Sequence, residues 1–224
     1  MSLKPTKKTD LGKAWLKGRE ERQQSILIHP EYHLIVSEGT KTEPNYFEAI
    51  KEKINRDYKD RIKVEIEGTG LDTVNLVNLA EKYVSESPNG FKHVWVVYDK
   101  DDFPAEHFNL AAELCRTKTT ENTIYHALWS NQCIELWFLL HFSYYQADTH
   151  RDDYYPKLTE QLMKIGAGEY KKNRKDIYYV LRPFMEQAVG NAKKLASINE
   201  GKTPTESAPG TEVYRIIESL RPYL

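Results

Sequence analysis

The sequence between residues 33 and 129 alternates short, β-branched apolar segments with longer amphipathic ones. Short apolar segments bounded by Gly or Pro are typical of buried strands, whereas apolar residues spaced three and four apart are typical of helices. We expect strands over residues 33–37, 61–67, 93–98 and 122–129, and helices over residues 43–56, 71–85 and 104–117. Strands that alternate with helices predict a parallel sheet covered by helices on both faces, which makes the chain an α/β protein.

The pattern changes after about residue 145, where strand signals stop. Helical periodicity predicts helices over residues 154–165, 174–196 and 211–220, and the Gly-, Thr-, Pro- and Ser-containing stretch 199–210 predicts a loop. We therefore divide the chain into a basic flexible arm, an α/β domain and a C-terminal helical subdomain that packs on the α/β core. These parts are expected to span residues 1–25, 26–145 and 146–224.

The composition is that of a folded protein, since 40% of the 224 residues are hydrophobic and the chain contains 15 Tyr, 7 Phe and 4 Trp. The longest apolar run, residues 133–142, is about half the roughly 20 residues that span a bilayer. The basic N-terminus lacks the hydrophobic core of a signal peptide, and Cys115 and Cys133 form neither a disulfide framework nor a metal motif. We therefore expect a cytoplasmic protein without a membrane segment.

The formal net charge of −1 conceals an uneven distribution of charge. Lys and Arg predominate over residues 1–22 and again over residues 164–175. Two basic segments around an acidic centre suit a protein that holds phosphates near a bound metal ion. A solvated charged surface produces the same pattern, and charge alone favours that plainer interpretation.

Carboxylates follow two of the expected strands at the point where each strand ends. Glu38 lies just past the first strand, and Asp99 and Asp101 lie just past the third. Sites in open parallel sheets form beyond the carboxyl ends of the strands. Residues two apart in an extended chain point to the same side, so we expect Asp99 and Asp101 to converge and Asp102 to point away. Such a cluster is suited to Mg²⁺, although Asp also occurs in ordinary turns and helix caps.

Glu135 lies in the longest apolar run, where an unpaired buried carboxylate would cost several kcal/mol. One interpretation is that Glu135 belongs to the metal or active site. The other is an ordinary first-turn Glu that is stabilised by the helix dipole after a Ser130 or Asn131 cap. The sequence leaves both open.

The segment after Glu38 leads into the first expected helix. Thr42 as the N-cap residue places Pro44 harmlessly in the first turn, so we prefer this start. Gly39 allows a tight turn and close approach of a phosphate to the backbone. Glu43 is either an ordinary first-turn residue or a site residue, because it lies only five positions beyond Glu38.

Three segments of the chain resemble the motifs of RloB-like proteins, a Toprim-containing family associated with bacterial restriction and phage-defence loci. They are EGTKTEPNYF at residues 38–47, the stretch 94–103 that contains YDKDDF, and SNQCIELW followed by LLHF over residues 130–142. The family pattern usually has Pro where this chain has Gln132. The resemblance implies a Toprim-like, Rossmann-like core that cleaves nucleic acid, DNA or RNA, beside an RloA-type ATPase partner.

The resemblance also implies roles for individual residues. Glu38, Asp99 and Asp101 would hold Mg²⁺, with Mn²⁺ as an alternative, and Glu135 would complete a second metal position, as in the related overcoming-lysogenization-defect nucleases. Apart from the resemblance, Lys171 or Lys172, in a basic segment near Tyr170, is a candidate to supply a cation to the transition state, although a surface-exposed lysine pair is the favoured interpretation. The residues expected to contact substrate are Gly39, Lys41, Glu43 and Lys172.

The sequence leaves open several alternatives for the function of the chain and for the role of His141. His141 is interpreted as a hydrogen-bonded core histidine rather than a general base. No Walker A sequence occurs in the chain, so it is not itself a P-loop ATPase. A primase or a ribosomal-RNA maturase is a rival within the Toprim class. A non-catalytic nucleic-acid-binding or regulatory subunit of an ATPase complex is the alternative from a different class, and homo-oligomer formation is left open.

Overall fold

The computed structural model describes residues 31–58, 61–66 and 73–224, which belong to one compact unit spanning Glu31–Leu224. The arm expected over residues 1–25 lies outside the described residues. Within the described part of the chain, no helix is long and apolar enough to cross a membrane.

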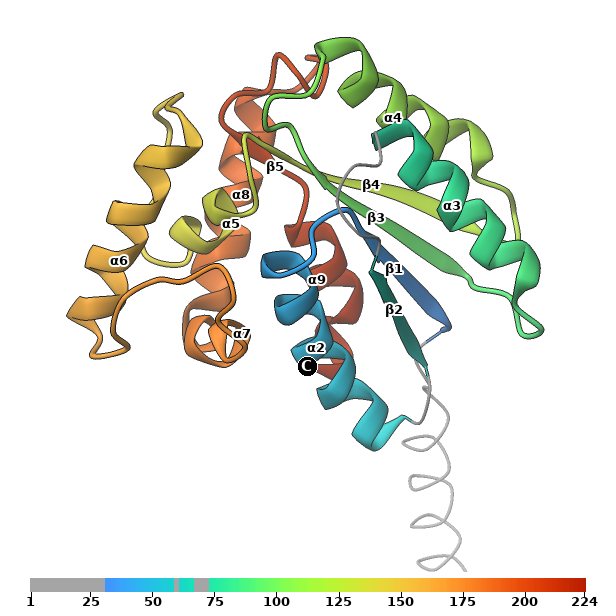
Figure 1. Cartoon of the computed structure of the whole chain (residues 1–224), viewed down its shortest axis with the longest axis horizontal. Coiled ribbons are helices and arrows are strands. Elements are labelled where there is room, and N and C mark those ends of the chain that lie inside the picture. Colours follow the sequence, from blue (N-terminus) through green and yellow to red (C-terminus); the bar gives the residue numbers. More distant parts are fainter. Residues whose placement is uncertain (1–30, 59–60, 67–72) are drawn as a thin grey trace, which may run out of the picture. The chain divides into compact units, whose positions relative to one another are not determined.

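A mixed sheet forms the centre of this unit (Figure 1). Its strands are β1 (His33–Ser37), β2 (Ile62–Ile66), β3 (His93–Asp99), β4 (Ile124–Asn131) and β5 (Gly210–Thr211). The strand order is β2-β1-β3-β4-β5, with β1 to β4 parallel and β5 antiparallel to β4. The α/β prediction is confirmed, but the expectation that strands stop after about residue 145 is wrong. β5 is only two residues long and therefore has no periodic pattern in the sequence.

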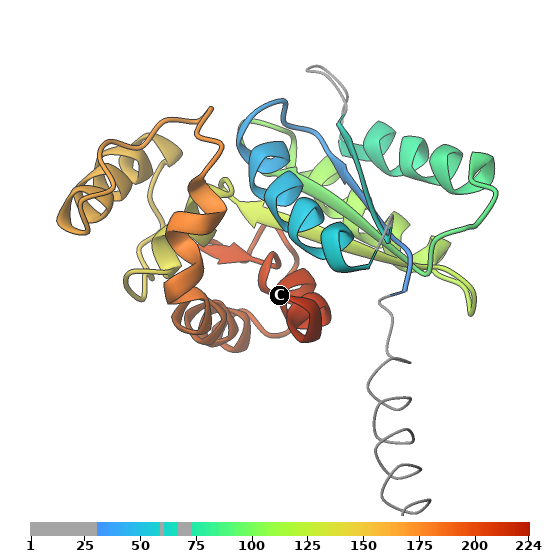
Figure 2. The same ribbon diagram turned by 90° about the horizontal axis from the view of Figure 1, so that it is seen from below.

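Helices cover both faces of the sheet, as the sequence predicted. Helices α3 (Thr73–Glu86) and α4 (Ala105–Lys118) lie on one face, and α2 (Thr42–Asp57) and α9 (Tyr214–Leu220) lie on the other (Figure 2). The alternation along β3 explains the two layers. Val94 and Val96 belong to the hydrophobic cluster under α3 and α4, whereas Trp95 and Val97 belong to the cluster on the opposite face.

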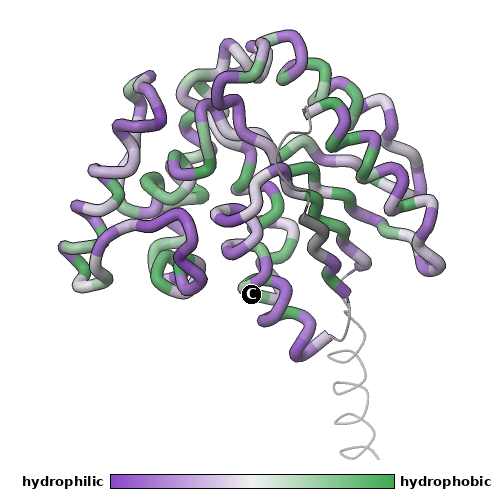
Figure 3. Tube along the Cα trace, in the orientation of Figure 1, coloured by the Kyte–Doolittle hydropathy of each residue, from purple (hydrophilic) through white to green (hydrophobic). Residues whose placement is uncertain are grey.

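The remaining helices extend the second layer. They are α5 (Glu135–Leu140), α6 (Tyr154–Lys164), α7 (Ile177–Leu181) and α8 (Met185–Ile198), with 3₁₀ turns at Arg151–Asp153, Arg182–Phe184 and Arg221–Tyr223. Their buried side chains join one hydrophobic cluster that also contains Ile35 of β1 and Phe47 of α2. Figure 3 shows the hydrophobic residues gathered in the strands and the hydrophilic ones along the outer turns.

The single helix predicted over residues 174–196 is wrong. The structure divides this segment into α7, a 3₁₀ turn that contains Pro183, and α8. Proline lacks the N–H that an α-helix needs in its interior, so it separates the two helices at this point.

Candidate active site

A cleft of about 340 Å³ lies at the carboxyl ends of β1 and β3. Its walls come from the loop after β1, the start of α2, the loop after β3, the start of α5 and the segment before α7. The lining residues are Glu38, Gly39, Thr40, Lys41, Thr42, Glu43, Asp99, Asp101, Cys133, Ile134, Glu135 and Lys172. The structure thus brings together every site residue predicted from the sequence except Lys171.

Backbone hydrogen bonds continue beyond the ends of the strands and position the acidic loops. The Glu38 N–H donates to the Val97 carbonyl at 3.2 Å, and the Asp101 N–H donates to the Gln132 carbonyl at 3.0 Å. Asp101 has a φ of 37°, in the left-handed region, so the chain is no longer extended there. The extended-chain reasoning for Asp101 was therefore wrong, although Asp99 and Asp101 do line the same cleft.

Asp99 is one of three buried carboxylates of the cleft, with an exposed fraction of 9%. Its Oδ2 atom accepts a hydrogen bond from the Ile134 N–H at 3.1 Å, whereas its buried Oδ1 atom has no hydrogen-bond partner. Burial, and then repulsion by the carboxylates of Glu43, Asp101 and Glu135, raise the pKa of Asp99 well above its usual range. The charged form of Asp99 is therefore poorly stabilised by the protein alone.

Glu43 shares this environment. Burial, and then repulsion by Glu135 and Asp101, raise the pKa of Glu43 to about 7. Hydrogen bonding to its own backbone and to the Asp99 carboxyl lowers this pKa, but by less. The side chain packs against Gly39, where a Cβ atom would overlap the Glu43 carboxylate. The absence of a Cβ atom at Gly39 therefore leaves room for the Glu43 carboxylate in its observed position.

The start of α2 differs from the prediction by one residue. Lys41 occupies the N-cap position and makes no side-chain cap, while Thr42 is the first helical residue and Pro44 lies in the first turn. The Thr42 hydroxyl donates instead to the Lys172 carbonyl at 3.3 Å, which ties the helix start to the segment before α7.

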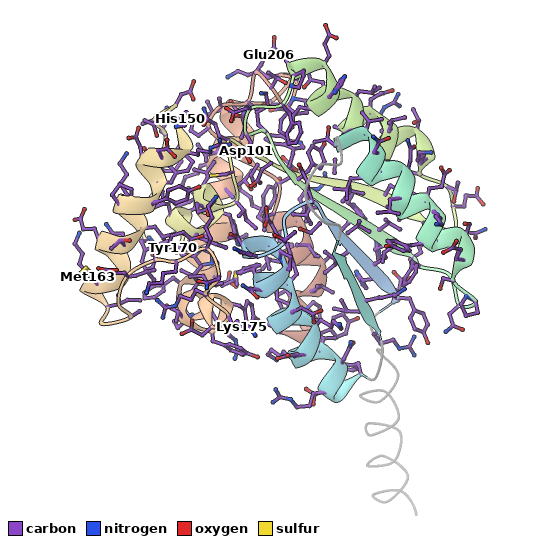
Figure 4. The ribbon with its side chains drawn as sticks, in the orientation of Figure 1. Asp101, His150, Met163, Tyr170, Lys175 and Glu206 are labelled. Carbon is purple, nitrogen blue, oxygen red and sulfur yellow. The ribbon has the colours of Figure 1, made fainter. Side chains whose placement is uncertain are left out.

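Glu135 is buried at the start of α5, with an exposed fraction of 2%, and its carboxylate lines the cleft. Ser130 and Asn131 belong to β4, so the predicted cap by either residue is wrong, and Ile134 takes the N-cap position. The Tyr170 hydroxyl donates to Glu135 Oε1 at 2.7 Å. Figure 4 labels Tyr170 on the segment between α6 and α7. Tyr170 was not among the predicted site residues, because no local pattern links it to Glu135.

Lys171 and Lys172, both expected near the site, lie in different surface hollows. Lys172 lines the cleft, and its Nζ atom lies 5.0 Å from the centre of the Tyr155 ring. Partial burial acts to lower the pKa of Lys172, but Tyr155 and the Glu135 and Asp101 carboxylates raise it overall, so it carries its charge. Lys171 is exposed and lines a different surface hollow with Glu169 and Arg174. The structure brings Lys172 to the cleft and leaves Lys171 outside its lining.

Arg151 is a second residue that the sequence reasoning missed. Its Nη1 atom lies 2.6 Å from Asp101 Oδ1, and its Nη2 atom lies 2.7 Å from Asp102 Oδ2. Hydrogen bonding to Asp101 is the largest cause that raises the pKa of Arg151, and attraction to Asp101 and Asp102 adds to it. Burial lowers this pKa, but by less. Arg151 is 49 or 50 positions from these partners in a segment without a motif, so no sequence signal pointed to it.

His141 is a core residue, as interpreted from the sequence. It is fully buried, its Nδ1–H donates to the Trp137 carbonyl at 2.9 Å, and burial lowers its pKa to about 4. It is not among the residues that line the cleft.

The donors in the cleft fit a hard divalent cation. The groups are carboxylates; the pKa values of Glu43 and Asp99 are raised, and Asp99 presents a buried oxygen without a hydrogen-bond partner. Among the described residues, no three carboxylate, imidazole or thiol groups are already gathered around one point. Mg²⁺ does not require such a cage, because it keeps several water molecules and uses one or two carboxylates together with substrate phosphates.

The fold and cleft define an α/β protein with an acidic site at the carboxyl edge of a mostly parallel sheet. The family model for RloB-like protein matches residues 33–220, which is most of the chain. The chain therefore belongs to the RloB-like family. No curated protein and no solved structure matches it.

Proposed function

We propose that this chain is a metal-dependent nuclease of the Toprim type that hydrolyses phosphodiester bonds in the acidic cleft. The observation that carries the proposal is Asp99, a buried carboxylate with one oxygen unpartnered and with Glu43, Asp101 and Glu135 as electrostatic neighbours. Buried carboxylates of like charge are destabilising unless protonation neutralises them or a cation compensates them. Their presence at a sheet edge where α/β proteins bind ligands favours a functional role.

Glu38, Asp99, Asp101 and Glu135 are the residues that would hold Mg²⁺ or Mn²⁺. When bound, such an ion polarises the scissile phosphate and lowers the pKa of a water molecule. Asp99 would bind through its unpartnered Oδ1 atom, because its Oδ2 atom is already oriented by the Ile134 N–H. The hydrogen bond from Tyr170 orients Glu135 in the same way.

The remaining cleft residues bind substrate and move protons. Lys172 and Lys41 line the cleft and would hold phosphate oxygens near the carboxylates. Glu43, whose pKa is raised to about 7, is suited to accept the proton of the attacking water near neutral pH. Because Gly39 has no Cβ atom, the Glu43 carboxylate can lie against the loop after β1.

The biological setting is also part of the proposal. A role in phage defence beside an RloA-type ATPase follows from the association of RloB-like proteins with defence loci. The chain lacks a Walker A sequence, which leaves ATP hydrolysis to that partner.

A cleavage assay tests the proposed function. The full chain is incubated with DNA and with total RNA in Mg²⁺, Mn²⁺ or EDTA, alone and with the ATPase partner. We expect metal-dependent cleavage that is lost in Asp99→Asn and kept in Glu106→Gln, whose exposed carboxylate lies on α4 outside the cleft lining. No cleavage under any of these conditions, or equal cleavage by Asp99→Asn, would refute the proposal and favour a non-catalytic subunit.

A further inference from the structure

The guanidinium of Arg151 forks between two consecutive aspartates of the loop after β3. One arm contacts Asp101 Oδ1 at 2.6 Å and the other contacts Asp102 Oδ2 at 2.7 Å. Asp101 lines the cleft, whereas the Asp102 side chain is 81% exposed and is not among the lining residues. Arg151 therefore connects a candidate metal ligand to a carboxylate outside the cleft.

The position of Arg151 is built into the fold rather than being a chance surface contact. The Arg151 N–H donates to Gln132 Oε1 at 2.9 Å, and the Gln132 carbonyl accepts the Asp101 N–H at 3.0 Å. Gln132 thus fixes the backbone on both sides of the ion pair. Figure 4 labels Asp101 and also His150, the residue before Arg151.

A divalent cation and the Arg151 guanidinium would compete for the same carboxylate. Mg²⁺ sits about 2 Å from its ligand oxygens, so an ion on Asp101 would lie within a few ångströms of the guanidinium nitrogen already bound there. Two cations at that separation repel strongly at the effective dielectric constant of a partly buried site. Binding of either cation to Asp101 therefore weakens binding of the other.

We propose that Arg151 occupies Asp101 in the cation-free protein and shifts fully onto Asp102 when a divalent cation binds. The inference rests on the proposed metal site and adds how that site is regulated. Asp102 provides a second anchor, so the guanidinium needs to release only one of its two contacts.

Titration with Mn²⁺ tests this inference without relying on activity. The full chain is stripped with EDTA, dialysed and titrated by isothermal calorimetry as wild type, Arg151→Gln and Arg151→Lys. We expect Arg151→Gln to bind Mn²⁺ about tenfold more tightly, because the competing charge is gone, and Arg151→Lys to fall between the two. Arg116→Gln is the matched control, since Arg116 also forks onto a carboxylate, Glu113, on the exposed surface of α4.

A double-mutant cycle isolates the role of Asp102. Asp102→Asn removes the second anchor, so we expect weaker Mn²⁺ binding in the presence of Arg151 and little change in the Arg151→Gln background. A similar loss in both backgrounds would mean that Asp102 acts on the ion directly and would overturn its role as an anchor.

The outcomes separate this inference from the proposed function. Mn²⁺ binding by wild type that is unchanged or weakened in Arg151→Gln, with the melting temperature retained, would overturn the competition and leave the metal site standing. Mn²⁺ binding by Arg151→Gln but not by wild type would support the inference, because it would mean that Arg151 excludes the ion from Asp101 completely. No binding by either protein would refute the metal site and the inference together.

Discussion

Two clusters of ionisable side chains occupy opposite ends of the same face of the sheet. β3 contributes to both, since His93 begins the strand and Asp99 ends it with the same orientation. At the amino end, His93 contacts His126 at 3.0 Å and Glu31 at 2.9 Å, and the Trp95 indole donates to His33 at 2.9 Å. We call this group, His33, His93, His126 and Trp95, the imidazole cluster.

The two clusters differ in whether their polar atoms find hydrogen-bond partners within the protein. Burial, followed by the neighbouring imidazoles, lowers the pKa of His33 to about 3, so this ring is neutral at physiological pH and uses its hydrogen bonds within the fold. At the carboxyl end, Asp99 retains an unpartnered oxygen and a raised pKa. The imidazole cluster therefore has its hydrogen bonds within the fold, whereas the carboxylate cluster, Glu38, Glu43, Asp99, Asp101 and Glu135, has a buried oxygen that no protein group satisfies and that the proposed cation would contact.

The largest expected effect concerns stability at the imidazole cluster. Trp95→Ala should lower the free energy of unfolding by about 3–5 kcal/mol, because it removes a buried indole and the donor to His33. Trp95→Phe should cost about 1–3 kcal/mol, since the ring is largely kept and only the donor is lost. Urea unfolding measures both values. Mn²⁺ affinity should remain unchanged in Trp95→Phe, and a large loss of affinity there would show that the two clusters are not independent.

The pH dependence of stability should have opposite signs at the two ends. Burial, then His93 and Arg215, lower the pKa of His126 to about 3, so His33 and His126 destabilise the fold as the pH falls from about 6.5. Glu43, with its pKa raised to about 7, destabilises it as the pH rises from about 4.5. Between pH 7 and pH 5 the two contributions oppose each other.

Glu43→Gln separates these contributions. We expect Glu43→Gln in EDTA to lose roughly 2 kcal/mol more stability than wild type between pH 7 and pH 5, because the variant lacks the stabilising uptake of a proton by Glu43. Urea unfolding at pH 5, 6 and 7 provides the comparison, with Glu106→Gln as the control. Parallel profiles for wild type and Glu43→Gln would contradict a raised pKa at Glu43.

Gly39→Ala is a smaller perturbation of the carboxylate cluster. The added Cβ would overlap the Glu43 carboxylate and displace it, so Mn²⁺ affinity should fall about tenfold. Gly190→Ala, on α8 where a Cβ meets open space, is the matched control and should bind like wild type. Equal affinities for both variants would mean that the position of Glu43 does not matter for cation binding.

The smallest expected effect distinguishes the two lysines. Lys172→Ala should weaken binding of a fluorescent single-stranded oligonucleotide about three- to tenfold at low salt, because Lys172 lines the cleft and keeps its charge. Lys171→Ala should have a smaller effect, since that side chain lies in a separate hollow. Fluorescence anisotropy gives both affinities, and equal losses would show that the lysines act only through general charge.

The carboxylates of the cleft were predictable because their positions follow from local patterns. Glu38 and Asp99 end buried strands, and parallel strands bring such ends to one edge of the sheet. Glu43 and Glu135 lie in the first turns of the helices that begin at this edge. Residues placed by the succession of strands and helices could therefore be identified from the sequence.

The cations and hydroxyls around these carboxylates were not predictable in the same way. Arg151 and Tyr170 contact carboxylates of the cleft through the packing of segments that carry no periodic pattern near them. The choice between Lys171 and Lys172 depends on the local path of a non-helical segment, which composition does not determine. β5 was missed because two residues are too few to show alternation.

Thermal unfolding of wild type and Asp99→Asn, in EDTA and in Mn²⁺, tests most directly whether the carboxylate cluster is completed by a cation. Asn keeps an acceptor for the Ile134 N–H and removes the free-energy cost of burying a carboxyl whose pKa is raised, so Asp99→Asn should melt several degrees higher than wild type in EDTA. Mn²⁺ should raise the melting temperature of wild type by mass action and leave Asp99→Asn almost unchanged. A lower melting temperature of Asp99→Asn in EDTA, together with equal responses of both proteins to Mn²⁺, would contradict the metal site at Asp99.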